Sequence, residues 1–151
     1  MFSLMERARR RRGKSGFTLV ELLVVIVVLA ILAAIVLPKF MSSSKRSQES
    51  ALKSDLKLIR NAVDLFRTDT GLYPKTAADL AATAAPAKGL GADAAEADIT
   101  ATDWHGPYLQ ELPTDPISKA AFTYSTTAGT VGNVTSSAAG ASLDGTNYSA
   151  W

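Results

Sequence analysis

The feature that most constrains this chain is a predominantly apolar run at positions 17–37, which reads FTLVELLVVIVVLAILAAIVL. As a helix, this run would rise about 32 Å, which is enough to cross the hydrocarbon core of a bilayer. Only Thr18 and Glu21 break its apolar character, and Leu22 to Leu37 contains no polar residue. A core helix of a soluble protein keeps a polar stripe on one side. The run therefore predicts a membrane-spanning helix.

The distribution of charge predicts the orientation of this helix. Positions 1–16 hold six of the sixteen Lys and Arg residues and a single acid, Glu6. The remainder holds ten basic and thirteen acidic residues, so the body of the chain is mildly acidic. Positive charge before a span favours a cytoplasmic N-terminal tail, which places residues 39–151 outside the cytoplasm. Because 39–151 shows no basic stripe with interleaved aromatic residues, we expect no direct contact with nucleic acid.

The small residues that accompany the apolar run precede it. A secretory signal peptide has a shorter apolar region, followed by a small-residue cleavage site. Here Gly13, Ser15 and Gly16 lie between the basic tail and the run. Any cleavage signal is therefore on the cytoplasmic side, and cleavage there would leave the helix as a retained anchor.

Glu21 is an acid inside the predicted span. A carboxylate in a membrane helix costs about 2.5–3.5 kcal/mol on insertion scales, so it needs a partner or a proton. One interpretation is that Glu21 lies at the interface and reaches headgroup water. The other is that its charge is functional and meets its partner only on assembly.

Positions 16–21, GFTLVE, follow the basic leader directly and resemble the processing site of type IV prepilins and type II secretion pseudopilins. The resemblance implies that a prepilin peptidase removes residues 1–16 by cutting between Gly16 and Phe17. It also implies N-methylation of Phe17 and pairing of Glu21 with the N-terminal amine of a neighbouring subunit. Two opposite charges in a medium of low dielectric offset each other's desolvation cost when they meet.

Beyond the membrane, the sequence predicts that the helix continues. Residues 17–38 form the transmembrane and polymerisation helix, and Pro38 favours a kink at its end. Residues 39–70 form an amphipathic second half, which Gly71 ends as a cap. Its apolar side chains are spaced by four and three residues, which predicts one buried stripe. The stripe consists of Leu52, Leu56, Ile59, Val63 and Phe66.

Residues 71–151 are predicted to form a globular head. Thr76 followed by Asp79 predicts a short helix at 76–85. The acids between positions 93 and 103 predict a solvated acidic loop. Three short strands are predicted at 122–126, 130–135 and 146–151. A small antiparallel sheet that packs on the helix stripe gives an α+β fold.

Three further segments, 71–74 (GLYP), 106–109 (GPYL) and 113–116 (PTDP), resemble the major pseudopilins of type II secretion. The resemblance implies a pilin-like fold and a homopolymeric filament. Its implied partners are the prepilin peptidase and the inner-membrane assembly platform. The subunit would lie in the inner membrane before assembly and in a periplasmic pseudopilus afterwards. The alternative is a type IV pilin of a surface pilus that serves adhesion, motility or DNA uptake.

The sequence gives little support for a calcium site and none for an enzymatic site. The family binds calcium in a loop before its final strand, but Asp144 is the single acid after Asp115, so it is a weak calcium candidate and no cofactor is expected. No enzyme is expected either. The chain has no cysteine and a single histidine, His105, and it shows no nucleophile–base pair, metal constellation or cofactor motif.

Overall fold

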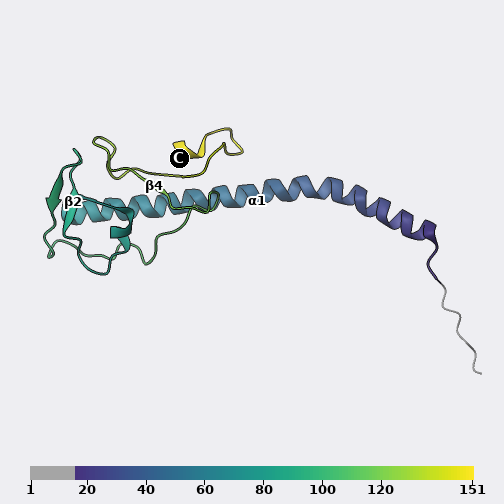
Figure 1. Cartoon of the computed structure of the whole chain (residues 1–151), viewed down its shortest axis with the longest axis horizontal. Coiled ribbons are helices and arrows are strands. Elements are labelled where there is room, and N and C mark those ends of the chain that lie inside the picture. Colours follow the sequence, from purple (N-terminus) through teal and green to yellow (C-terminus); the bar gives the residue numbers. More distant parts are fainter. Residues whose placement is uncertain (1–15) are drawn as a thin grey trace, which may run out of the picture. The chain divides into compact units, whose positions relative to one another are not determined.

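The computed structural model describes residues 16–151, so all of the predicted leader except Gly16 lies outside the described residues. The described chain divides into two compact units, which meet between Met41 and Ser42. Helix α1, Leu19–Thr70, belongs to both units (Figure 1). Each unit is described by itself below.

The first unit contains the apolar part of α1. The large apolar side chains of this part are exposed, from 44% at Val36 to 85% at Leu19. Among residues 16–151, α1 is the one helix that is long and apolar enough to cross a membrane. The helix is continuous through Pro38, so the kink stays a prediction.

The second unit begins with the amphipathic part of α1, where the predicted stripe is confirmed. Its five side chains are at most 3% exposed, and Ala62 joins them. The end of the helix is also as predicted. Gly71 adopts a φ of +72°, a left-handed conformation that favours glycine, and its N–H donates to the Arg67 carbonyl at 2.9 Å.

A three-stranded antiparallel sheet follows the helix. It consists of β1 (Tyr73–Pro74), β2 (Lys88–Leu90) and β3 (Glu96–Asp98), in that order. Between β1 and β2, the predicted short helix is present as a 3₁₀-helix, Ala77–Ala81, and Asp79 Oδ2 accepts the Thr76 N–H at 2.7 Å.

The acids Asp93, Glu96, Asp98 and Asp103 are exposed, as predicted, but the prediction that all four lie in a loop is wrong for the two middle ones. Glu96 and Asp98 lie on the edge strand β3. The reason is antiparallel backbone pairing with β2, in which Glu96 lies opposite Leu90 and Asp98 opposite Lys88. Glu96 also forms ion pairs with Lys75 at 2.5 Å and with Lys88 at 3.3 Å.

The C-terminal third forms less sheet than its composition predicts. Only β4 (Thr123–Tyr124) and β5 (Val134–Thr135) pair, antiparallel, as a separate two-stranded sheet. The strand predicted at 130–135 is shortened because turns occupy 127–132, where Gly132 has a φ of +84°. The strand predicted at 146–151 is wrong. Asn147 forms an isolated bridge with Ala141, and Tyr148–Ala150 is a 3₁₀-helix.

The core of the second unit lies between the α1 stripe and these short segments. Leu80, Leu109, Val134, Ala138 and Tyr148 are buried against it. The α+β class and the long N-terminal helix are therefore confirmed, with two small sheets in place of the single one predicted.

Candidate functional site

The first candidate site is the beginning of α1, where Thr18 and Glu21 cap the helix reciprocally. Glu21 Oε2 accepts the Thr18 N–H and the Thr18 hydroxyl, both at 2.8 Å. The Glu21 N–H donates to Thr18 Oγ1 at 3.2 Å. The first amide groups of a helix lack partners within it, and a Thr-x-x-Glu box satisfies two of them. The cap was not among the sequence predictions, although the Thr-x-x-Glu spacing is a readable signal for it.

The capping leaves part of the Glu21 carboxylate accessible. No described residue donates a hydrogen bond to Glu21 Oε1, and the side chain is exposed. Oε1 can therefore accept a donor from another molecule while Oε2 keeps its contacts with Thr18. The predicted cleavage site lies just before this cap, since Gly16 and Phe17 are exposed and precede the helix.

The second candidate is the C-terminal segment, 140–151, which is held on the amphipathic part of α1 (Figure 1). Glu49 Oε1 accepts the Leu143 N–H at 2.8 Å and the Tyr148 hydroxyl at 2.9 Å. The Lys45 ammonium donates to the Ala141 carbonyl at 3.0 Å. Direct polar contacts thus fasten this segment to the helix.

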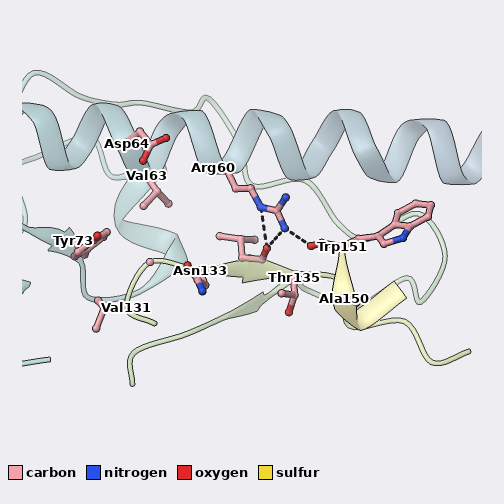
Figure 2. A pocket seen from close by; sticks show the side chains of 11 residues that line it. Arg60, Val63, Asp64, Tyr73, Val131, Asn133, Thr135, Ala150 and Trp151 are labelled. Carbon is pink, nitrogen blue, oxygen red and sulfur yellow. Dashed lines mark hydrogen bonds between the residues drawn. The ribbon is translucent and has the colours of Figure 1, made fainter. Parts of the chain in front are cut away.

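Arg60 adds a contact at the far end of the segment. Its guanidinium donates to the Val134 carbonyl through Nε at 3.1 Å and through Nη2 at 2.6 Å, and Nη2 also donates to the Trp151 carbonyl. These groups border a cavity of about 450 Å³ between α1 and β5, shown in Figure 2.

Asp144, the weak calcium candidate, lies in a turn of the C-terminal segment. Its Oδ1 accepts the Ser142 hydroxyl and the Thr146 N–H, the latter at 2.9 Å. The hydrogen bonds from Ser142 and then Thr146 lower the pKa of Asp144 to about 2. Within residues 16–151, no three His, Cys, Asp or Glu side chains gather into a metal-binding group.

Asp115 is a buried acid that sequence analysis did not single out. It is fully buried, and both carboxylate oxygens are hydrogen-bonded. Oδ1 accepts the N–H groups of Ile117 and Ser118, and Oδ2 accepts the Ser136 hydroxyl and the Ser137 N–H. Burial raises the pKa of Asp115, but these hydrogen bonds together lower it below its ordinary value. The Asp-Pro turn was the signal that would have placed it.

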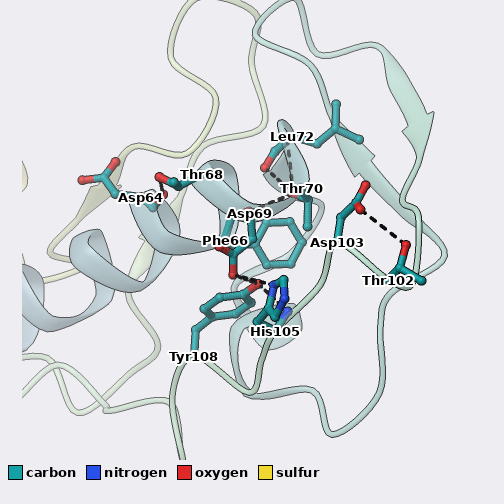
Figure 3. Close-up of polar contacts among 10 residues, drawn as sticks. All are labelled: Asp64, Phe66, Thr68, Asp69, Thr70, Leu72, Thr102, Asp103, His105 and Tyr108. Carbon is teal, nitrogen blue, oxygen red and sulfur yellow. Dashed lines mark hydrogen bonds and ion pairs between the residues drawn. The ribbon is translucent and has the colours of Figure 1, made fainter.

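His105 lies beside Asp69 and Tyr108 (Figure 3). Asp69 Oδ2 accepts the Tyr108 hydroxyl at 2.8 Å and is 3.5 Å from His105 Nδ1. The His105 side chain is 71% exposed, and the Tyr108 hydroxyl oxygen accepts the His105 N–H at 3.2 Å. This group links the 104–108 loop to the end of α1, which is a structural role.

Two protein-family models match the chain. The family model for protein G of the type II secretion system matches residues 39–148, and the model for the prokaryotic N-terminal methylation motif matches residues 11–37. The chain belongs to the protein G family of type II secretion. No solved structure gives a match.

Curated relatives carry the same name, type II secretion system core protein G. The Pseudomonas aeruginosa protein is 37% identical over 107 residues, which is 70% of each chain. The Aeromonas hydrophila protein is 36% identical over 111 residues, which is 70% of this chain and 69% of the relative. The Klebsiella pneumoniae protein is 34% identical over 102 residues, 67% of each chain.

Membership of the protein G family distinguishes a pseudopilin from a pilin of a surface pilus. The chain is a pseudopilin, a structural filament subunit of type II secretion, and the interpretation as a surface pilin is not supported by these matches. The methylation motif and the exposed apolar helix also indicate anchoring in a membrane.

Proposed function

We propose that the chain is cut between Gly16 and Phe17 and N-methylated on Phe17, and that it polymerises when Glu21 pairs with the Phe17 amine of a neighbouring copy. The observation that carries the proposal is the geometry of the Glu21 carboxylate. Its Oε2 is occupied by Thr18 of its own chain, while Oε1 has no donor among the described residues. A cationic amine is a suitable partner for that oxygen, and a methylated amine can keep its charge.

The charges explain why assembly would select one stagger between copies. Phe17 and Glu21 are four residues apart, which corresponds to a rise of about 6 Å when α1 extends from Leu19 back to Phe17 in the assembled subunit. A neighbour displaced by that distance presents its amine to the Glu21 carboxylate in a dry environment. An unpaired charge buried there costs about 3–5 kcal/mol, so other staggers are disfavoured.

The same proposal includes an orientation and two partners. The basic residues before the span favour a cytoplasmic leader and a periplasmic head. The prepilin peptidase would then act at the cytoplasmic face, and the inner-membrane assembly platform would receive the processed subunit. The methylation-motif match at 11–37 supports the processing step.

Mass spectrometry of the membrane or filament protein tests the processing. We expect an N-terminal Phe17 that carries a methyl group. Replacing Gly16 with a large residue should leave the uncut precursor in the membrane. An intact leader on assembled protein, or a cut after position 37, would contradict the proposal.

Substitutions at Glu21 separate charge pairing from helix capping. Glu21→Ala and Glu21→Leu remove both, and we expect membrane insertion and processing but poor filament assembly and secretion. Glu21→Gln is the matched control, because glutamine can still cap Thr18 but carries no charge. We expect Glu21→Gln to assemble as poorly as Glu21→Ala. Normal assembly of Glu21→Gln would show that capping, and not the charge, is what assembly requires.

We also propose that the head needs no calcium. The donor set supports this, because Asp144 is a single exposed carboxylate whose Oδ1 is already hydrogen-bonded to Ser142 and Thr146. Calcium sites use six to eight oxygen ligands, several of them carboxylates. Chelation should therefore change the melting temperature of the purified protein by less than about 2 °C, since little ligand binding energy would be lost. A fall of ten degrees or more would contradict the proposal.

A further inference from the structure

The apolar unit of α1 carries a charge near each of its ends. Among residues 16–41 the charged side chains are Glu21 and Lys39, and the seventeen residues between them, 22–38, are uncharged. As a helix, this interval rises about 26 Å, whereas the hydrocarbon core of a bilayer is about 30 Å thick. The uncharged interval is therefore about 4 Å shorter than the layer that the helix has to cross.

Two large apolar side chains lie directly beyond Lys39. Phe40 and Met41 are 70% and 72% exposed, which is more than any large apolar side chain from Leu22 to Leu37. Lys39 is exposed as well, and its ammonium group takes part in no ion pair within residues 16–151. This end of the unit thus presents a cation and two apolar side chains that the described chain leaves uncovered.

A lysine at this position can extend its charge beyond its own level in the helix. Lysine buries its stem along apolar surface and keeps its ammonium group in a polar layer. Its four-carbon stem is longer than the rise of about 3 Å that separates Lys39 from Met41. When Lys39 extends in this way, residues 22–41 lie in the hydrocarbon core. These twenty residues rise about 30 Å, which matches the thickness of the core.

The negative partner of Lys39 comes from outside this part of the chain. Residues 22–48 contain no acid, so no carboxylate of this stretch of α1 can pair with Lys39. The methylation motif and the apolar helix indicate anchoring in a membrane, and a residue just beyond the span lies at the headgroup layer. Phospholipid headgroups attract basic side chains next to a span. A lipid phosphate is therefore the anion within reach of Lys39.

We propose that residues 39–41 form the phospholipid contact of the unassembled subunit, in the leaflet on the periplasmic side. Lys39 binds a lipid phosphate, and Phe40 and Met41 lie among the acyl chains beneath it. This contact rests on the proposed function, since it describes the anchored subunit before polymerisation. It also fixes the depth of the helix, because it places Glu21 at the opposite edge of the hydrocarbon core. The Glu21 carboxylate then enters a dry environment only on assembly.

The rate at which a thiol at position 41 reacts with a reagent in water tests the contact. The chain has no cysteine, so Met41→Cys introduces the one thiol present. The full-length variant is reconstituted into vesicles and treated with an uncharged maleimide that does not cross the bilayer. The reference is Ser44→Cys, an exposed position three residues further along α1. The ratio of the two rates cancels differences in orientation among the vesicles.

The charge of the lipid headgroup should control this ratio. In phosphatidylglycerol vesicles Lys39 is attracted to the surface, and we expect the thiol at position 41 to be protected several-fold relative to the reference. In vesicles of a cationic lipid Lys39 is repelled, and the protection should be lost. Lys39→Glu should reverse this order, because its charge is opposite and its stem is shorter. Lys39→Arg should behave as the wild type does.

Lys57→Glu is the matched control. Lys57 is also an exposed lysine of α1, but it lies eighteen residues beyond Lys39, about 27 Å further along the helix and outside the headgroup layer. We expect this variant to leave the ratio unchanged. The proposal is overturned if the ratio is independent of headgroup charge, or if Lys39→Glu and Lys57→Glu change it equally.

A second copy as the partner of Lys39 would give a different result. Protection at position 41 would then increase with the ratio of protein to lipid and would not depend on the headgroup, and this outcome would overturn the lipid contact. The proposed function fails separately, when the processed wild type forms no filaments. Because the vesicle measurement needs no filament, the two failures are distinguishable.

Discussion

The two halves of α1 form one continuous helix, yet they differ in the exposure of their apolar side chains. In residues 19–41 the large apolar side chains are exposed, whereas in residues 42–70 a single stripe is almost fully buried by the head. Helix formation is common to both, so the difference comes from what covers the side chains. The second half is covered by its own chain. The first half needs lipid or other copies, which is what a subunit that is anchored first and assembled later requires.

The polar side chains differ in the same way. In the second half, Lys45, Glu49 and Arg60 make contacts to segments more than seventy residues away in sequence. In the first half, the one partner of Glu21 among residues 16–151 is Thr18, three residues away. The second half therefore specifies the fold of the head, while the acid of the first half makes only a local contact within residues 16–151, as the proposed pairing with a neighbour requires.

The largest expected effect that tests this comparison comes from truncating the buried stripe. Phe66 is fully buried, so Phe66→Ala should lower the free energy of unfolding of the head by about 3–5 kcal/mol. Leu29→Ala is the matched control on the exposed half, where the side chain is 58% exposed. Thermal unfolding of the full chain in detergent should show a large shift for the first variant and almost none for the second. Comparable shifts in melting temperature for the two variants would mean that the two halves of α1 do not differ in how their apolar side chains support the folded state.

The next effect concerns the buried acid that supports the head. Asp115→Asn removes the charge and replaces one acceptor oxygen with an N–H₂ group that faces N–H donors. Hydrogen bonds to charged groups contribute about 1.5–3 kcal/mol each, so we expect the free energy of unfolding to fall by about 2–3 kcal/mol. Denaturant titration at neutral pH measures the loss.

The pH dependence of that loss has a definite sign. The pKa of Asp115 is lowered in the folded state, so the unfolded chain binds the proton more readily. The stabilisation by Asp115 is therefore complete above the ordinary pKa of about 4 and declines as the pH falls through the lower, folded-state value. The difference between wild type and Asp115→Asn should narrow in that acid range. A constant difference from pH 7 to pH 2 would show that the charge is not responsible.

The sequence was sufficient for features that repeat along one helix. The apolar run, the stripe from Leu52 to Phe66 and the Gly71 cap follow from periodicity and from backbone conformations that only some residues adopt readily. The pseudopilin resemblance was also readable, because the GFTLVE motif is local and highly specific. These features need no knowledge of what lies far away in the chain.

The other features of the fold depend on contacts between residues that are far apart in the sequence. The two-residue strands β4 and β5 are too short for alternation to define, and residues 148–150 read as a strand but turn into a 3₁₀-helix. Asp115 looks like an ordinary turn residue until Ser136 and Ser137 reach it from more than twenty positions away. Such pairings are determined by the packing of the head on α1, and they produce no periodic pattern in the sequence.

A smaller loss of stability is expected when Arg60, on the amphipathic half of α1, is replaced. Arg60→Met keeps the apolar stem but removes the donors to Val134 and Trp151, and we expect a loss of about 1 kcal/mol because the side chain is exposed. Lys57→Met is the control, since Lys57 is also exposed on α1 and should change stability by less than about 0.5 kcal/mol. Equal effects in thermal unfolding would show that the Arg60 contacts contribute nothing specific.

The smallest effect is a gain in stability at Asp55. Burial first, and then the charge of Asp115, raise the pKa of Asp55 above its ordinary value. A raised pKa in the folded state means that ionisation costs stability, and this cost grows as the pH rises through the shifted range. Asp55→Asn removes the cost, so the melting temperature at pH 7 should rise by about 1–3 °C, with little change near pH 3. In the Asp115→Asn background the gain should be smaller, because part of the repulsion is already absent. An equal gain in melting temperature in both backgrounds would assign the whole effect to burial of Asp55. A loss of stability at pH 7 would instead show that the Asp55 charge has a favourable partner on α1 or the head.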